Sequence, residues 1–211
     1  MIFVNRFDAG TKLGKLLSAV LTKDDKPVVY ALVRGGAVVG DAVAEVLNAP
    51  FDVVLVRKIG HPSWPEYAIG AIAGNDEPVY NQAEIGQLNQ LEVAAIVARE
   101  RNTIAERQAL YFDMHKRISA RDKTAILVDD GIATGLTARA AVKYIRHQSP
   151  KQLIIAIPVG ADDSIEELKK LVDKVVVVDD PAHFAGAVSR HYQSFDQVSD
   201  AEVIKLLNKH Q

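Results

Sequence analysis

The chain lacks cysteine, has few aromatic residues (6%), and carries no strong excess of either charge. Without cysteine it offers no disulfide, no thiolate ligand for a metal and no thiol nucleophile. The absence of disulfides is typical of a reducing compartment, so we expect a cytoplasmic protein. With 25 Lys and Arg against 27 Asp and Glu, the formal net charge is −2. No overall positive field therefore attracts nucleic acid, and we expect none to bind.

Long apolar runs are also missing. No uncharged apolar stretch reaches the ~18 residues that a membrane span needs. The N-terminus lacks a basic start followed by a long apolar run, so we expect neither a signal peptide nor membrane association. The remaining composition is ordinary for a globular protein: 211 residues, 48% hydrophobic and 25% charged. We predict one domain over residues 1–211 with a full hydrophobic core.

Short apolar segments alternate along the chain with helical patterns. Near-continuous apolar strands separated by helices are typical of a parallel sheet that is covered on both faces. We therefore predict an α/β fold in which a doubly wound parallel sheet is flanked by helices. Strands are expected at residues 27–33, 51–56, 124–128, 152–158 and 174–178, and helices at 8–21, 37–47, 87–115 and 200–209.

Two segments interrupt this alternation. Residues 59–80 are rich in glycine and proline, which predicts a flexible loop or a short hairpin. Residues 87–115 form a long, charge-dense helical pattern inside a helical insertion at about 85–117. This helix could be a dimer arm or an intramolecular cover, and the sequence leaves both open.

The segment Ile126–Thr137 carries the clearest chemical signal. A buried strand ends in two adjacent carboxylates, Asp129 and Asp130, and a Gly/Thr loop then leads into a helix. Loop glycines let backbone N–H groups approach a phosphate, and a helix N-terminus adds free donors and partial positive charge. The carboxylates would repel a phosphate but can accept hydrogen bonds from sugar hydroxyls. The segment therefore predicts a site that holds a sugar and a phosphate side by side.

Two familiar phosphate-binding motifs are excluded. The loop has no Gly-Lys-Thr/Ser and its glycine spacing is wrong for a Walker A motif. Gly35, Gly36 and Gly40 lack the Gly-x-Gly-x-x-Gly spacing of the dinucleotide fingerprint.

Other polar residues follow the ends of neighbouring predicted strands. Arg34 follows the first strand, Arg57 and Lys58 follow the second, and Pro181 follows the last. Ligands of open parallel sheets bind beyond the carboxyl ends of the strands, so these positions are expected to converge with the acidic pair. Arg57 and Lys58 could be surface charge, but a strand end at the site favours contact with an anion.

The acidic pair and its loop resemble the signature of type I phosphoribosyltransferases, which bind phosphoribosyl pyrophosphate (PRPP). The whole chain resembles a bacterial and archaeal branch of predicted phosphoribosyltransferases. The supporting segments are Leu32–Gly36, Arg57–Ile72, Ala156–Val159, Pro181–Phe184 and Tyr192. The resemblance implies transfer of the phosphoribosyl group from PRPP to a nitrogen nucleophile, with release of pyrophosphate.

The resemblance also implies a role for each site residue. Asp129, Asp130, Lys58 and Arg34 would be catalytic. Arg34, Gly35, Gly36, Arg57 and Lys58 would bind pyrophosphate, and a cis peptide bond is expected at Arg34–Gly35. The 5′-phosphate would be held by Gly131, Ile132, Ala133, Thr134, Gly135, Leu136 and Thr137. Mg²⁺ would bind mainly through PRPP, with no direct protein ligand. The family implies a homodimer.

A C-terminal hood at about 179–196 would recognise the acceptor, a nucleobase, through Asp179, Asp180 or Phe184. Core packing is the simpler role for Phe184. Purine salvage enzymes commonly carry an aromatic residue before the hood proline and an aspartate at the position of Ala133. This chain departs from both patterns, which leaves the identity of the base open.

Several further residues and functions stay open. His61 could bind phosphate or act as an acid or base, and Trp64 could anchor its loop in the core or cover the ligand. Arg107 and Tyr111 could reach a ligand across a subunit boundary. A PRPP-sensing regulator and a phosphoribosyl ester hydrolase are the alternatives to a transferase. A regulator would use the basic residues Arg99, Arg101, Arg107, Lys116, Arg117, Arg121 and Lys123.

Overall fold

A computed structural model describes residues 1–113 and 115–210, apart from the side chain of Lys23. Among these residues, five parallel strands form the main sheet in the order β2-β1-β6-β7-β8. The strands are β1 Pro27–Leu32, β2 Phe51–Val54, β6 Thr124–Val128, β7 Gln152–Ile157 and β8 Lys174–Val177. The predicted doubly wound α/β fold is confirmed.

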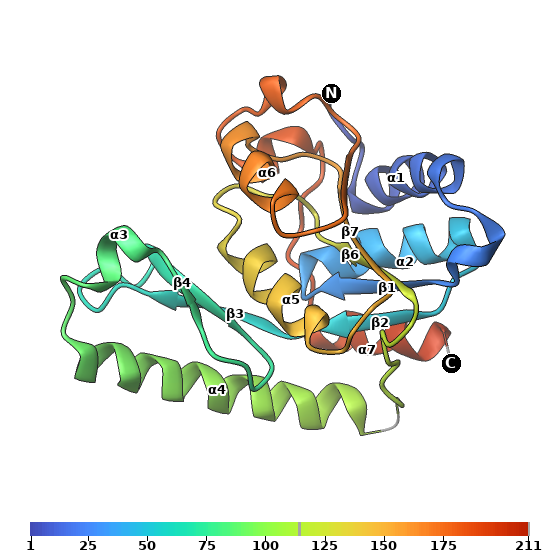
Figure 1. Cartoon of the computed structure of the whole chain (residues 1–211). Helices are drawn as coiled ribbons and strands as arrows, with labels where there is room; N and C mark the ends of the chain where they lie inside the picture. Colours follow the sequence, from blue (N-terminus) through green and yellow to red (C-terminus); the bar gives the residue numbers. More distant parts are fainter. Residues whose placement is uncertain (114, 211) are drawn as a thin grey trace.

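Helices cover both faces of this sheet (Figure 1). One face carries α1 (Arg6–Val20), α2 (Gly35–Leu47) and α7 (Asp200–Lys209), and the other carries α5 (Leu136–Arg146) and α6 (Asp162–Lys169). The central strands β1, β6 and β7 are almost wholly apolar, since helices cover both faces of the sheet. In β1, for example, alternate residues join two separate cores, Val29 and Ala31 on the α2 side and Val28 and Tyr30 on the α5 side.

The region between β2 and β6 forms an arm, residues 56–112, that extends from the main sheet (Figure 1). Its antiparallel sheet consists of β3 (Val56–Gly60), β4 (Ala68–Ala73) and β5 (Val79–Tyr80). The short helix α3 (Gln82–Ile85) and the long helix α4 (Gln90–Phe112) follow. The hairpin alternative for residues 59–80 is thus the one observed, and the expected loop is reduced to two connections around β4.

Helix α4 packs on β3 and β4. Asn89 caps its N-terminus, and Val93, Val97 and Ile104, spaced along one face, are buried in the core. Arg101 donates to the carbonyls of Asn75 and Asp76 in the β4–β5 connection at 3.2 Å each. The long helix is therefore an intramolecular cover of the arm sheet, one of the two roles left open by the sequence.

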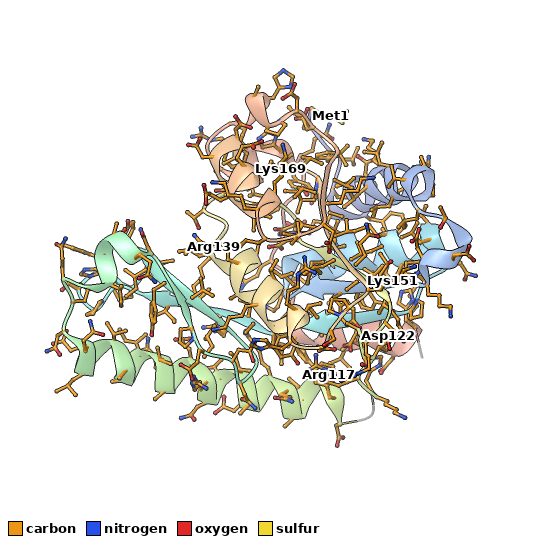
Figure 2. The ribbon with its side chains drawn as sticks, viewed as in Figure 1. Met1, Arg117, Asp122, Arg139, Lys151 and Lys169 are labelled. Carbon is orange, nitrogen blue, oxygen red and sulfur yellow. The ribbon has the colours of Figure 1, made fainter. Side chains whose placement is uncertain are left out.

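The C-terminal end of α4 is tied back to the main domain. Tyr111 donates a hydrogen bond to Asp200 at the start of α7, and Arg107 lies 3.5 Å from the same carboxylate. Arg107 and Tyr111 thus make contacts within the chain, and their reach to another subunit's ligand stays a prediction. Arg117, which is labelled in Figure 2, lies 4.5 Å from the ring of Phe112 and secures the segment that follows α4.

The C-terminal hood consists of two 3₁₀ turns, η2 (Pro181–His183) and η3 (Val188–His191), and the residues around them. It is joined to the N-terminus by the bridge between Phe3 and Tyr192. No helix in the described residues has the length and apolar character needed to span a membrane.

Candidate active site

The winding of the main sheet reverses between β1 and β6. From β1 the chain crosses to β2 through α2, whereas from β6 it crosses to β7 through α5 in the opposite direction. The loops after these two strands diverge, and ligands bind in the crevice that opens there. This crevice is where the residues predicted to form the site meet.

The loop after β1 lies directly against the acidic pair. A Cβ atom on Gly35 would lie 2.0 Å from Oδ2 of Asp130, and one on Gly36 would lie 2.9 Å from the carbonyl oxygen of Val128. Only glycine permits this approach of two backbones. The cis peptide bond in this loop is Val33–Arg34, so the expected position, Arg34–Gly35, was wrong by one residue. Gly35 already belongs to the first turn of α2, where a regular trans bond continues the helix.

Asp129 and Asp130 are half-buried neighbours at the end of β6. Oδ1 of Asp129 accepts a hydrogen bond from the backbone N–H of Asp130 at 2.9 Å. Burial raises the pKa of Asp129 well above its usual range, and the charge of Asp130 raises it further. Burial also raises the pKa of Asp130, and the Arg6 guanidinium opposes that rise. A site of this kind stabilises the two negative charges only when a ligand supplies donors or positive charge.

Arg6 is a site residue that the sequence did not reveal. Its Nε lies 2.8 Å from Oδ2 of Asp130, and its Nη1 donates to the carbonyl of Asp196 at 2.7 Å. Its guanidinium also lies 3.7 Å from the ring centroid of Phe195. A basic residue in the first turn of a helix opposes the helix dipole. That unfavourable placement is the only signal in the sequence that Arg6 has a partner elsewhere.

The loop 131–137 is held in shape by the segment after β7. The N–H of Ile132 donates to Val159 at 3.0 Å, and Oγ of Ser164 donates to the carbonyl of Ala133 at 2.7 Å. Gly135, with φ of 71°, is the N-cap of α5 and contributes no capping side chain. The first amides of α5 are therefore available to an anion.

These residues enclose a cavity of about 270 Å³, here called the acidic cavity. It contains the acidic pair, Lys58 and all of the predicted phosphate loop except Leu136, which is buried in the core. Its lining residues are Leu32, Val33, Val56, Lys58, Asp129, Asp130, Gly131, Ile132, Ala133, Thr134, Gly135, Thr137 and Val188.

A second cavity, of about 470 Å³, lies between β3, β4 and α4 and is called the arm cavity. It shares Val33, Val56, Lys58 and Thr137 with the acidic cavity, so the two cavities adjoin. Arg57 lines it, with Nε 2.8 Å from Oε2 of Glu100. The predicted partners Arg57 and Lys58 thus lie together beside the acidic pair.

Arg34 does not line either cavity. Burial raises the pKa of the Tyr111 phenol, and the positive charge of Arg34 is one of the influences that oppose this rise. The role of Arg34 at pyrophosphate stays a prediction.

The hood residues that were predicted to contact a base make contacts within the chain. Asp179 pairs with the N-terminal amino group and lies 3.7 Å from His191, while Asp180 accepts the N–H of Ala182 at 3.0 Å. Phe184 stacks on His191, in agreement with core packing. Contact of these residues with a base stays a prediction.

Two residues that the sequence left open as ligand contacts, His61 and Trp64, lie in the connection between β3 and β4. Trp64 is 66% exposed, so it does not anchor this connection in the core. Its ring lies 4.7 Å from that of His61, which lines the arm cavity. Nδ1 of His61 accepts the N–H of Ser63 at 3.1 Å.

Tyr192 joins the hood to the acidic pair. Its hydroxyl donates to the carbonyl of Asp130 at 2.6 Å, and its ring packs against Phe3 and Phe195. Together with Arg6, it fixes the backbone and the side chain of Asp130 from two sides.

The family model of the phosphoribosyl transferase domain matches residues 9–193, a range that includes the acidic pair, its loop and most of the hood. The chain belongs to the phosphoribosyl transferase family. Two Mycobacterium tuberculosis proteins, from strains H37Rv and CDC 1551, are each 39% identical over 211 residues and are both named "Putative phosphoribosyl transferase". The match covers 99% of this chain and 47% of each relative, so the chain spans about half the length of these curated relatives.

A solved structure supports the same family fold. The crystal structure of TT1426 from Thermus thermophilus is 34% identical, with a TM-score of 0.82 and coverage of 99% of both chains. The similarity to TT1426 therefore includes the arm as well as the main sheet, since nearly the whole of both chains is aligned.

Proposed function

We propose that the protein transfers the 5-phosphoribosyl group of PRPP to a nitrogen nucleophile, a nucleobase, and releases pyrophosphate. The observation that carries the proposal is that the two cavities adjoin. The start of α5 and the paired carboxylates line the acidic cavity, and cationic side chains line the adjoining arm cavity. This is the order in which PRPP presents its 5′-phosphate, its ribose hydroxyls and its diphosphate.

The loop 131–137 would hold the 5′-phosphate through the amides at the start of α5 and the hydroxyls of Thr134 and Thr137. Asp129 and Asp130 would accept hydrogen bonds from the 2′- and 3′-hydroxyls of the ribose. Held in this way, C1 of the sugar is fixed between the arm cavity and the hood, which lowers the entropic part of the barrier.

In the transfer step, the bond from C1 to the diphosphate oxygen breaks and a bond from C1 to the acceptor nitrogen forms. The electron pair leaves with the diphosphate, and the nitrogen loses its proton to the surrounding water. Negative charge builds on the diphosphate, where Lys58, Arg57 and the amides of Gly35 and Gly36 would stabilise it. Carboxylates near the sugar ring would stabilise the positive charge that develops there. Arg34 is proposed to contribute to the same stabilisation.

Mg²⁺ is expected to arrive with PRPP. The described residues contain no group of three or more His, Cys, Asp or Glu side chains placed to hold a metal ion. The two carboxylates of Asp129 and Asp130 suit a cation that is bound mainly through the diphosphate and ribose oxygens of PRPP. When bound, Mg²⁺ would neutralise charge on the leaving group.

The acceptor is proposed to enter from the hood side, since the cationic arm cavity is assigned to the diphosphate. Val188 is the hood residue that lines the acidic cavity. Asp179, Asp180, Phe184 and backbone groups nearby remain the candidates for contact with the base.

The experiment is calorimetric titration with PRPP and Mg²⁺, followed by measurement of pyrophosphate release with a panel of nucleobases. Binding by the wild type and its loss in the Asp129→Asn/Asp130→Asn double variant would support the PRPP site. Base-dependent release would identify the acceptor. Release without any base would indicate hydrolysis, and binding without turnover would indicate a regulator. We further propose a cytoplasmic homodimer, which sedimentation analysis would test.

A regulator that binds nucleic acid has less support than the transferase. Several of the basic residues that it would use are paired within the chain: Arg101 with Glu77, Arg107 with Asp200 and Arg117 with Asp52. Ion pairs of this kind reduce the positive field available to a nucleic acid.

A further inference from the structure

Helix α4 brings two charged side chains, Arg99 and Glu100, to the wall of the arm cavity. The carboxylate of Glu100 is only 8% exposed. One of its oxygens lies 2.8 Å from Nε of Arg57, and the other lies 3.3 Å from Nε of Arg99. A single buried carboxylate therefore holds one guanidinium group from β3 and one from α4.

Both arginines keep their terminal nitrogens free for a ligand. Each uses Nε on Glu100, and within the described part of the chain neither has a hydrogen-bond partner for Nη1 or Nη2. Lys58, which lines the same cavity, likewise has no ion-pair partner among the described residues. Guanidinium groups bind phosphate oxygens in a bidentate manner, and a lysine adds a point charge. The chemistry of this wall suits a polyanion.

The position of the wall indicates which part of a ligand would reach it. The arm cavity is lined by residues of β3, β4 and α4, whereas the acidic cavity is lined by the loop after β6 and by Val188 of the hood. A ligand with its phosphate in the loop 131–137 and its sugar over the acidic pair would have one substituent of C1 on the cationic side.

We propose that Arg99 of α4 binds the diphosphate of the substrate and that Glu100 is a positioning residue for Arg57 and Arg99. The inference rests on the proposed function and adds the arm to the substrate site. Helix α4 would then have two roles, since it covers the arm sheet and also supplies one cation for the leaving group.

The test separates the two ends of the substrate. Inorganic pyrophosphate with Mg²⁺, and ribose 5-phosphate alone, are each titrated into the wild type and into Arg99→Gln. We expect Arg99→Gln to weaken pyrophosphate binding about tenfold, as for the loss of one charge-assisted contact, and to leave ribose 5-phosphate binding within about twofold. Arg101→Gln is the matched control, because it removes the same charge from the same helix outside the cavity.

Glu100→Ala tests the positioning role. Removal of a negative charge near an anion would by itself strengthen anion binding. If Glu100 holds the arginines in place, its loss should instead weaken pyrophosphate binding several-fold, because both guanidinium groups lose their anchor. Stronger pyrophosphate binding by Glu100→Ala would overturn the positioning role.

The remaining outcomes distinguish this inference from the proposed function. If Arg99→Gln binds pyrophosphate as the wild type does, or weakens both ligands equally, Arg99 is not a diphosphate contact and the inference is overturned alone. A wild type that binds neither ribose 5-phosphate nor PRPP would overturn the proposed function together with the inference.

Discussion

Arg6 and Asp130 form an ion pair that joins the first helix to the end of the central strand. The two residues are 124 positions apart, and their side chains are only 10% and 16% exposed. Nε lies 2.8 Å from Oδ2, while the other side of the guanidinium is anchored on Asp196 and Phe195. The pair fixes Asp130 where a ribose hydroxyl is proposed to bind.

Arg6→Gln should destabilise the protein and weaken PRPP binding. It leaves a buried carboxylate without a matching charge, which typically costs about 3 kcal/mol. Urea denaturation would measure the loss. The double variant Arg6→Gln/Asp130→Asn also removes the unpaired negative charge, so it should be more stable than Arg6→Gln alone. If the double variant instead loses as much stability as the two single variants added together, the pairing is contradicted.

Asp129→Asn should abolish PRPP binding but make the unliganded protein more stable at neutral pH. The pKa of Asp129 is raised on folding, so the folded state holds its proton more tightly than the unfolded state does. The resulting stabilisation is complete below the ordinary pKa of about 3.8 and is lost as the pH rises through the raised pKa. The free energy of unfolding of the wild type should therefore fall as the pH rises from the ordinary pKa of Asp129 to its raised pKa.

Denaturation curves from about pH 4 to pH 8 would measure the effect. The Asp129→Asn protein should show a flatter dependence on pH than the wild type. An equal dependence in both proteins would mean that the acidic pair is not the group that titrates.

Gly35→Ala should reduce PRPP binding at least tenfold, because its Cβ would lie 2.0 Å from Oδ2 of Asp130 and must displace that side chain. Gly86→Ala is the matched control, since no atom lies within 4 Å of the Cβ position there. Calorimetry on both variants would measure the difference, and similar affinities would argue against the close approach of the two loops.

Gly135→Val should block the phosphate loop. Its φ of 71° is strained for valine, at a cost of about 1–3 kcal/mol, and the branched side chain would occupy the space at the start of α5. Gly186→Val is the control for backbone strain alone, because φ there is 81° and no atom lies within 4 Å of the Cβ position. Both variants should lose stability, but only Gly135→Val should lose ribose 5-phosphate binding.

Local patterns in the sequence were sufficient to predict the main sheet and the centre of the site. The strand 124–128, the acidic pair and the Gly/Thr loop are contiguous, so the strand, the turn and the helix start are set by residues that are neighbours in the chain. The alternation of apolar strands with helices was enough to predict the doubly wound sheet. The rule that parallel strands present their carboxyl ends at one edge predicted that Lys58 would lie near Asp129. Lys58 does line the acidic cavity, but it belongs to β3 of the antiparallel arm sheet and not to the end of a main-sheet strand.

The contacts that span long distances in the chain were decided only by the tertiary structure. Local patterns did not predict the partners of Arg6, Tyr192 and Glu100, because each acquires its partner only when distant segments pack together. The position of the cis peptide bond and the strands within 59–80 likewise depend on tertiary packing. The sequence by itself determined the fold class and the acidic pair with the loop that is proposed to bind phosphate, because short-range periodicity and turn chemistry specify them. Only the tertiary structure decided which charges face that loop, because a buried ion pair depends on where the chain returns in space.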